Sequence, residues 1–272
     1  MKSDGSTPGM SDDELLYEVS ERVATITINR PDRRNAMNGA VLEGMRASLE
    51  SAKWDPEVRV VVLTGAGEKA FCAGADLEQT MPASSGGGPV AAHYGRGVLA
   101  EVFRDIFSLG MPVVGRINGH ALAGGFGLAL AADILIASDN ATFGTPEINV
   151  GLWPMMITTV MKRSMPPKVA LELMMTGRRV SAAEAVERGF VNKVVPASDL
   201  DDAVAEVTRE LASKSPATMR LGRDAFYATL DMPADQALGY LQAQLGVVAQ
   251  TEDAVEGMTA FLQKREPEWK GR

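Results

Sequence analysis

The first part of the chain has the hydrophobic pattern of two strands, a helix and a buried strand. Residues 15–19 and 23–28 resemble two consecutive strands, and over 23–28 the side chains alternate with the period of two that strands require. Asn38 is a suitable helix cap, and apolar residues recur on one helical face over 41–52. Residues 60–63 are an unbroken apolar run, which is typical of a strand buried on both sides.

The alternation of strands and helices continues as far as Pro154. Residues 98–106 carry an apolar stripe at helical spacing, and residues 113–114 begin a second buried strand. Gly124 opens a short apolar helix, and residues 133–137 have the pattern of the next strand. Strands that alternate with helices in this way predict an α/β core.

Beyond this point the pattern is mainly helical. Gly177 is a suitable helix stop after the apolar positions at 169–175, and residues 181–184 have the spacing of a capping box. Four more helices are predicted, over residues 199–213, 216–230, 234–249 and 253–264. These helices follow one another without an intervening strand pattern, so we expect a helical C-terminal region.

The pattern divides the chain into three parts. Residues 1–12 are a polar tail that we expect to be disordered, 13–197 form the α/β core, and 198–272 form the helical region. Within the core, serine and glycine fill residues 84–88, which is the composition of a flexible loop. We therefore expect one α/β body with a helical extension.

Composition and charge exclude several classes of function. The 272-residue chain has 27 Lys and Arg against 35 Asp and Glu, and its net charge of −8 argues against nucleic-acid binding. One cysteine, Cys72, and two histidines argue against a disulfide and a metal site. The charge-free stretch at 117–132 is too short to span a membrane, and the N-terminus lacks an apolar signal-peptide core. We expect a soluble protein of the cytoplasm.

Glycine is densest over residues 119–127. A dinucleotide-binding fingerprint requires a third small residue after two glycines, but counting from Gly125 and Gly127 that position is Leu130. A Rossmann site is therefore not predicted. Two small-residue turns, at 72–76 and 123–125, could instead present backbone N–H groups to an oxyanion. Close packing of a helix on a strand is the alternative, and spacing alone favours it.

Short motifs along most of the chain resemble those of one known family. They occur at residues 29–31, 35–36, 70–77, 117–125, 132–133, 143–147, 176–178, 182–185, 189–191 and 256–265. Together they resemble the enoyl-CoA hydratase/isomerase (crotonase) family, and the tail and residues 150–152 are most similar to its enoyl-CoA hydratase domain-containing branch. The resemblance implies a crotonase-like spiral of ββα units, in which residues 198–272 are a trimerisation region that builds a homotrimer or hexamer.

The resemblance also implies a catalytic site made of backbone and one carboxylate. It assigns the N–H groups of Ala75 and Gly124 to an oxyanion hole for a thioester carbonyl oxygen. Hydratases of the family hold a water between two glutamates. Here the second glutamate is kept as Glu147, but Gly127 replaces the first. The substrate implied is an acyl-CoA thioester, with no separate cofactor and no metal.

A single carboxylate favours isomerisation, in which Glu147 removes a proton from one carbon and returns it to another. A hydratase is the close alternative, with Glu78, His93 or Tyr94 as the substitute acid, although a surface role suits each of these side chains. Because Gly127 replaces a catalytic glutamate, a non-catalytic acyl-CoA-binding protein is a further alternative. The oxyanion hole also serves thioesterases and C–C bond enzymes of the family.

The remaining positions implied by the resemblance contact CoA. They are Arg33, Arg34, Ala73, Asp76, Leu77, Gly125, Phe261 and Lys264. In the family, the tail residues reach CoA from a neighbouring subunit. A solvated turn is the alternative for the two arginines, and a helix C-terminal cation is the alternative for Lys264. Met155, Met156 and Met161 could line an acyl pocket, with core packing as the alternative.

Overall fold

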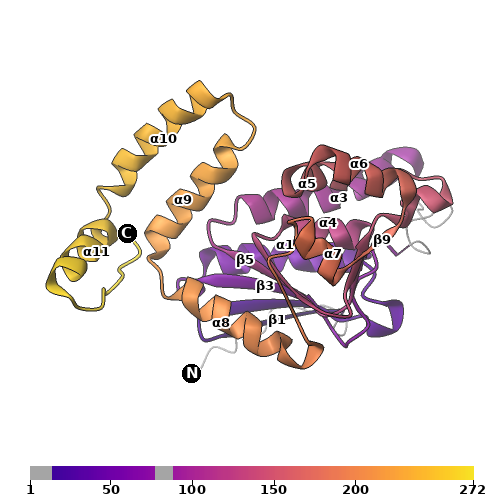
Figure 1. Ribbon diagram of the computed structural model, residues 1–272, viewed down its shortest axis with the longest axis horizontal. Coiled ribbons are helices and arrows are strands. Elements are labelled where there is room, and N and C mark those ends of the chain that lie inside the picture. Colours follow the sequence, from indigo (N-terminus) through magenta and orange to yellow (C-terminus); the bar gives the residue numbers. More distant parts are fainter. Residues whose placement is uncertain (1–13, 77–87) are drawn as a thin grey trace.

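The computed structural model describes residues 14–76 and 88–272. Figure 1 shows a body that carries two sheets and an arm of helices that extends from it. The predicted polar tail at 1–12 and the predicted loop, except Gly88, lie outside the described residues. None of the helices in the described ranges is long and apolar enough to cross a membrane.

The main sheet has six strands in the order β1-β2-β3-β5-β7-β10. They are β1 (Leu15–Ser20), β2 (Val23–Ile28), β3 (Val60–Gly65), β5 (Val113–Ile117), β7 (Ile134–Ser138) and β10 (Lys193–Val195). The β1–β2 hairpin is antiparallel and the other neighbours are parallel. All six residues of β3 are buried, as its unbroken apolar run predicts.

The second sheet has four short strands in the order β4-β6-β8-β9. They are β4 (Ala70–Cys72), β6 (His120–Leu122), β8 (Thr142–Gly144) and β9 (Arg179–Ser181). Strands β4, β6 and β8 run parallel to one another, whereas β9 is antiparallel to β8. This sheet was not predicted, because strands of three residues are too short to display an alternating pattern.

Helices cover both faces of the main sheet. Those of the body are α1 (Gly39–Trp54), α3 (Gly88–Phe107), α4 (Gly124–Ala131), α5 (Ile157–Ser164), α6 (Pro167–Thr176), α7 (Ala182–Glu187) and α8 (Leu200–Ala212). Side chains of β2 and β3 that share one face pack with α1, and those that point to the other face of β3 pack with α8. The oxygen Oδ1 of Asn38 accepts a hydrogen bond from Val41 N at 2.9 Å, which confirms the predicted cap.

The arm consists of α9 (Pro216–Thr229), α10 (Ala234–Val248) and α11 (Glu252–Gln263), as Figure 1 shows. Arg223 of α9 ties it to the body, since Nε donates to Asp133 Oδ2 at 2.8 Å and Nη2 donates to the carbonyl of Ile106 at 2.8 Å. Tyr227 donates to the other Asp133 oxygen at 2.6 Å. A cavity of about 930 Å³ lies between this part of the arm and the amino-terminal ends of β5 and β7.

The predicted boundary between core and helical region at residue 198 stays a prediction. The structure adds that α8, which follows this boundary, packs on the main sheet and not in the arm. Its buried residues Leu200 and Val204 belong to the same apolar cluster as Val60, Val62 and Val114 of the sheet. The arm itself therefore begins at Pro216 with α9.

Candidate functional site

Three adjacent parallel strands of the small sheet end at the same edge, and the candidate residues follow them. Gly74 and Ala75 come after β4, Gly124 comes after β6, and Glu147 comes after β8. In open α/β sheets, the carboxyl ends of parallel strands are where ligands bind. The small sheet therefore brings together three turns that lie far apart in the sequence.

The first turn is held by a parallel bridge to Met37. Met37 N donates to Gly74 O at 2.8 Å, and Asp76 N donates to Met37 O at 2.8 Å. Gly74 has a φ of +101°, and a Cβ atom added there would lie 2.7 Å from Ala123 Cβ and 3.3 Å from Gly124 N. The first and second turns are therefore in contact, and this contact requires glycine at position 74.

The second turn begins α4 and places a backbone N–H at its amino end. Ala123 precedes the helix with a φ of +52°, which a non-glycine residue rarely adopts, and its amide donates to Gly144 O at 2.9 Å. Neither the Ala75 nor the Gly124 amide donates to any other residue in the described part of the chain. An oxyanion hole requires two free amides that point at one oxygen, and the role of these two amides in such a hole stays a prediction.

Glu147 lies in the first turn of η2 (Pro146–Val150), a 3₁₀ helix that follows β8. The side chain is half-buried, and its Oε2 atom is buried without a hydrogen-bond partner among the described residues. Burial raises the pKa of the Glu147 carboxyl above its ordinary value, although a hydrogen bond from its own backbone amide lowers the pKa in part. A buried carboxylate with a free oxygen and a raised pKa is suited to proton transfer.

The raised pKa predicts a pH dependence for any reaction in which Glu147 acts as a base. The carboxylate must be ionised to accept a proton, so kcat/KM should fall as the pH drops through the pKa of Glu147 in the free protein. We expect this acidic limb to lie above 4.5, the ordinary value for the group. A profile of kcat/KM from pH 4 to pH 8 would measure it. A flat profile over this range would contradict the assignment.

Gly127 occupies the position at which the resemblance implies a second glutamate in hydratases. A Cβ atom added to Gly127 would lie 2.2 Å from Ile157 Cγ2 and 3.0 Å from Phe103 Cζ. Ile157 of α5 and Phe103 of α3 are both buried in the core. The space for a side chain at position 127 is therefore filled with hydrocarbon, and no carboxylate fits there without repacking.

Two of the predicted CoA contacts lie beside the first turn. Arg33 ends η1 (Pro31–Arg33), and Arg34 follows it with a φ of +52°. The carbonyl of Arg34 accepts a hydrogen bond from Ala73 N at 3.1 Å, so this loop and the first turn are neighbours. The roles of these three residues in CoA binding stay predictions.

Other predicted contacts have structural partners of their own. The Asp76 carboxylate accepts a hydrogen bond from Arg30 Nη2 at 2.9 Å, and both side chains are buried. A Cβ atom on Gly125 would lie 2.2 Å from Cys72 O, so glycine here permits close packing of α4 on β4. Burial raises the pKa of the Cys72 thiol to about 12, which leaves the thiol unreactive.

The predicted CoA contacts of the tail lie on the arm. Phe261 is 83% exposed, and Lys264 ends α11 in the left-handed conformation. Figure 1 shows α11 at the far end of the arm, away from α4 of the same chain. Leu77 and Glu78 lie outside the described residues, and the side chains of His93 and Tyr94 also belong to the part that is not described.

Sequence reasoning missed two residues that shape the site. Thr145 precedes the turn that carries Glu147, is fully buried, and donates from its hydroxyl to Leu173 O at 2.9 Å. Its only signal was its place in the 143–147 motif. Asn35 is also fully buried and donates to Ala70 O at 2.7 Å, which holds the η1 loop against β4. His120 Nδ1 pairs with the Thr142 hydroxyl at 2.8 Å, and burial lowers the pKa of the His120 imidazole.

The exposure of the predicted acyl-pocket methionines varies. Met155 is exposed, Met156 is partly exposed and Met161 is fully buried, so core packing accounts for Met161. Among the described residues, no group of three or more His, Cys, Asp and Glu side chains is arranged to hold a metal ion.

Comparison with known proteins agrees with this geometry. The sequence profile described as enoyl-CoA hydratase/isomerase matches residues 18–272. The carnitinyl-CoA dehydratase of Salmonella paratyphi A is 38% identical over 257 residues, which are 92% of this chain and 95% of that protein. The enoyl-CoA hydratase structure from Mycobacterium smegmatis is 33% identical with a TM-score of 0.90, covering 95% of this chain and 99% of its own.

The structure of a human protein is also similar to this chain. The structure of human enoyl Coenzyme A hydratase domain-containing protein 3 is 29% identical with a TM-score of 0.89, covering 94% of this chain and 100% of its own. The two sheets and C-terminal helices thus form the crotonase fold, which confirms the predicted fold class. Since the profile and the relatives cover nearly the whole chain, the protein belongs to the enoyl-CoA hydratase/isomerase family of acyl-CoA enzymes.

Proposed function

We propose that the protein moves the double bond of an enoyl-CoA, with Glu147 as the only acid and base. The amides of Ala75 and Gly124 donate to the thioester carbonyl oxygen and stabilise the negative charge that develops on it. The Glu147 carboxylate removes a proton from C2 of a 3-enoyl-CoA, which gives a dienolate. The same carboxyl group then donates this proton to C4, and the product is a 2-enoyl-CoA. The reaction neither consumes nor releases water.

The observation that carries this proposal is the packing at Gly127. Hydration requires one group to activate water and a proton source for C2. With Ile157 and Phe103 against Gly127, the position of the second glutamate holds no polar group. A single carboxylate with a raised pKa can shuttle one proton between two carbons of the same substrate.

A second candidate reaction is dehydration of a hydroxyacyl-CoA, which the name of the carnitinyl-CoA dehydratases favours. In this reaction Glu147 would remove the C2 proton, and the departing hydroxide would need a proton from the same carboxyl group or from a residue outside the described ranges. Both reactions use the same oxyanion hole. They differ in whether water is released.

The test is to incubate the purified protein with 3-enoyl-CoA, 2-enoyl-CoA and 3-hydroxyacyl-CoA, and to separate the products by chromatography. We expect the protein to interconvert 3-enoyl-CoA and 2-enoyl-CoA. We expect no Glu147-dependent reaction of 3-hydroxyacyl-CoA. Interconversion of 2-enoyl-CoA and 3-hydroxyacyl-CoA would favour the second candidate. Binding of these thioesters without turnover would indicate the non-catalytic alternative and contradict both reactions.

We also propose that the chain assembles into a homotrimer or hexamer in the cytoplasm through its arm. No residue of α10 is buried, and its stripe of Leu238, Leu241 and Leu245 is 66%, 40% and 68% exposed. Apolar residues that recur on one helical face in this way are typical of an interface. Assembly would also allow Phe261 and Lys264 of one subunit to reach the CoA of another, as the family resemblance implies.

The assembly can be tested by light scattering after size-exclusion chromatography. We expect a mass of three or six chains for the unaltered protein. Leu238→Glu should shift the protein towards the monomer, because it places a charge within the apolar stripe. Gln236→Glu adds the same side chain on the opposite side of α10 and should leave the mass unchanged. A monomer of unaltered protein at micromolar concentration would contradict the assembly.

A further inference from the structure

The turn that carries Glu147 does not fix its own position. It is a 3₁₀ helix of five residues, and Thr145 at its N-cap makes no side-chain capping bond to it. The Oε2 atom of Glu147 has no partner among the described residues. A proton-transfer group must nevertheless be held within a few tenths of an ångström of its working geometry. The position of this carboxylate therefore depends on whatever holds the turn.

The carboxyl end of α6 contacts the turn at both of its ends. Before the turn, the Thr145 hydroxyl donates to Leu173 O at 2.9 Å, and both residues are fully buried. After Glu147, the turn lies against Gly177, where an added Cβ atom would be 2.7 Å from Ile148 Cγ2 and 2.9 Å from Asn149 Nδ2. Any movement of the end of α6 would therefore displace the turn.

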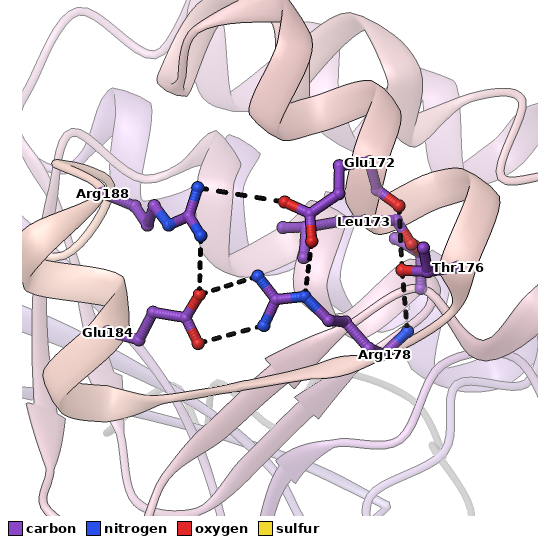
Figure 2. A network of polar contacts seen from close by, with 7 residues as sticks. Glu172, Leu173, Thr176, Arg178, Glu184 and Arg188 are labelled. Atoms are coloured by element: carbon purple, nitrogen blue, oxygen red, sulfur yellow. Dashed lines mark hydrogen bonds and ion pairs between the residues drawn. The ribbon is translucent and has the colours of Figure 1, made fainter.

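Arg178 fixes the end of α6 against α7, as Figure 2 shows. Its Nε donates to Glu172 Oε1 at 2.6 Å, and its two terminal nitrogens donate to both oxygens of Glu184 at 3.0 and 2.7 Å. Arg188 completes the cluster, donating to Glu184 Oε1 at 3.0 Å and lying 3.8 Å from Glu172 Oε2. Arg178 is therefore a rigid link between two helices.

The cluster is too exposed to be explained by fold stability alone. The side chains of Arg178, Glu172, Glu184 and Arg188 are each about a third exposed, and ion pairs in such positions contribute little to the free energy of unfolding. Hydrogen bonds from Arg178 lower the pKa of both glutamates, so the cluster keeps its charges in mildly acidic solution. Its planar, bidentate geometry restricts orientation more than it adds stability.

We propose that Arg178 and Thr145 are positioning residues for Glu147, with Arg178 holding the end of α6 and the Thr145 hydroxyl connecting that end to the turn. Neither residue touches the reacting atoms, and each acts through the carboxylate. The proposal rests on the proposed function, in which Glu147 is the base. It identifies the end of α6, which lies outside the oxyanion turns, as a part of the fold that affects the rate of proton transfer.

The first test is independent of catalysis. Hydrogen–deuterium exchange would be measured for the amides of residues 147–152 in the full chain and in Thr145→Val, Thr145→Ser, Arg178→Met and Arg116→Met. Thr145→Val removes the hydroxyl at nearly constant volume, and Thr145→Ser retains it. Arg116→Met is the matched control, because Arg116 bonds to Asp201 of α8 and to Thr64 and, within the described residues, makes no hydrogen bond or ion pair with α6 or η2.

We expect faster exchange at these amides in Thr145→Val and Arg178→Met, and unchanged exchange in Thr145→Ser and Arg116→Met. The hydrogen bonds from Gly151 N to Ile148 O and from Leu152 N to Glu147 O report directly on the turn. Unchanged exchange in both Thr145→Val and Arg178→Met would overturn the positioning role, whatever reaction the protein catalyses.

The second test uses turnover of 3-enoyl-CoA. We expect Thr145→Val and Arg178→Met to lower kcat by about tenfold with KM unchanged, because misplacement of the base affects the chemical step and not binding. Thr145→Ser should restore the rate. In a Glu147→Gln background, Thr145→Val should cause no further loss, because its effect passes through the carboxylate.

The proposal would be overturned if Thr145→Val lowered kcat by the same factor in the unaltered protein and in the Glu147→Gln background. A change in KM alone would also overturn it. If the unaltered protein fails to convert 3-enoyl-CoA but the exchange pattern is as expected, the proposed reaction is wrong and the positioning of Glu147 stands. If the reaction occurs and the exchange is unaffected, the positioning role is wrong and the reaction stands.

Discussion

Replacement of Glu147 by glutamine should lower kcat for enoyl-CoA isomerisation by about 10²- to 10⁴-fold, the usual contribution of a positioned acid or base. Glutamine keeps the shape of the side chain and removes its ability to accept and return a proton. The backbone amides that we propose to bind the thioester oxygen are untouched, so binding of a saturated acyl-CoA should be retained. Steady-state kinetics and calorimetric titration would measure the two quantities.

The same variant should be at least as stable as the unaltered protein at neutral pH. Burial raises the pKa of Glu147 in the folded state, so the stability that its neutral form provides is present at low pH and is lost as the pH rises through that pKa. Glutamine stays neutral, and its advantage in Tm should therefore grow from acidic to neutral pH. If Glu147→Gln retained full activity, Glu147 could not be the acid and base of the reaction.

Substitution of Gly127 by alanine should lower the free energy of unfolding by about 1–3 kcal/mol, the usual cost of overpacking a core. The added Cβ atom would lie 2.2 Å from Ile157 Cγ2 and 2.8 Å from Ile157 Cβ, both on a buried side chain. Chemical denaturation would measure the change. Gly222→Ala is the matched control, since no atom lies within 4 Å of a Cβ added at this helical glycine. It should raise the free energy of unfolding by up to about 1 kcal/mol.

The larger change, Gly127→Glu, tests whether packing alone prevents a second carboxylate. We expect it to destabilise the protein more than alanine does and not to create hydratase activity. Combined with Ile157→Gly, which removes both clashing atoms, it should be less destabilising than the sum of the two single changes. Additive effects of the pair would show that Ile157 is not what excludes a side chain at position 127.

Long elements with a clear period were predictable from the sequence. The strands at 15–19 and 23–28, the helix capped by Asn38 and the four C-terminal helices are confirmed within one or two residues. The buried strand at 60–63 extends to Gly65. These segments bury one face or both faces against the rest of the molecule, and their sequences carry that requirement directly.

The small sheet and the contacts of the site could not be predicted in this way. Its strands have three residues each, and their pairing joins segments that are far apart in the chain. The absence of a glutamate at position 127 was visible in the sequence, but the filling of its space by Ile157 and Phe103 depends on tertiary packing. The link from Arg178 through α6 to Thr145 likewise appears only in three dimensions.

The most direct test of a single-carboxylate isomerase is a reaction in water enriched in heavy oxygen. The purified protein would be incubated with 3-enoyl-CoA, and all acyl-CoA products would be identified by mass spectrometry over time. We expect 2-enoyl-CoA that carries no heavy oxygen, and its formation should be lost in Glu147→Gln. Accumulation of 3-hydroxyacyl-CoA that carries heavy oxygen, at a rate matching or exceeding isomerisation, would contradict the account.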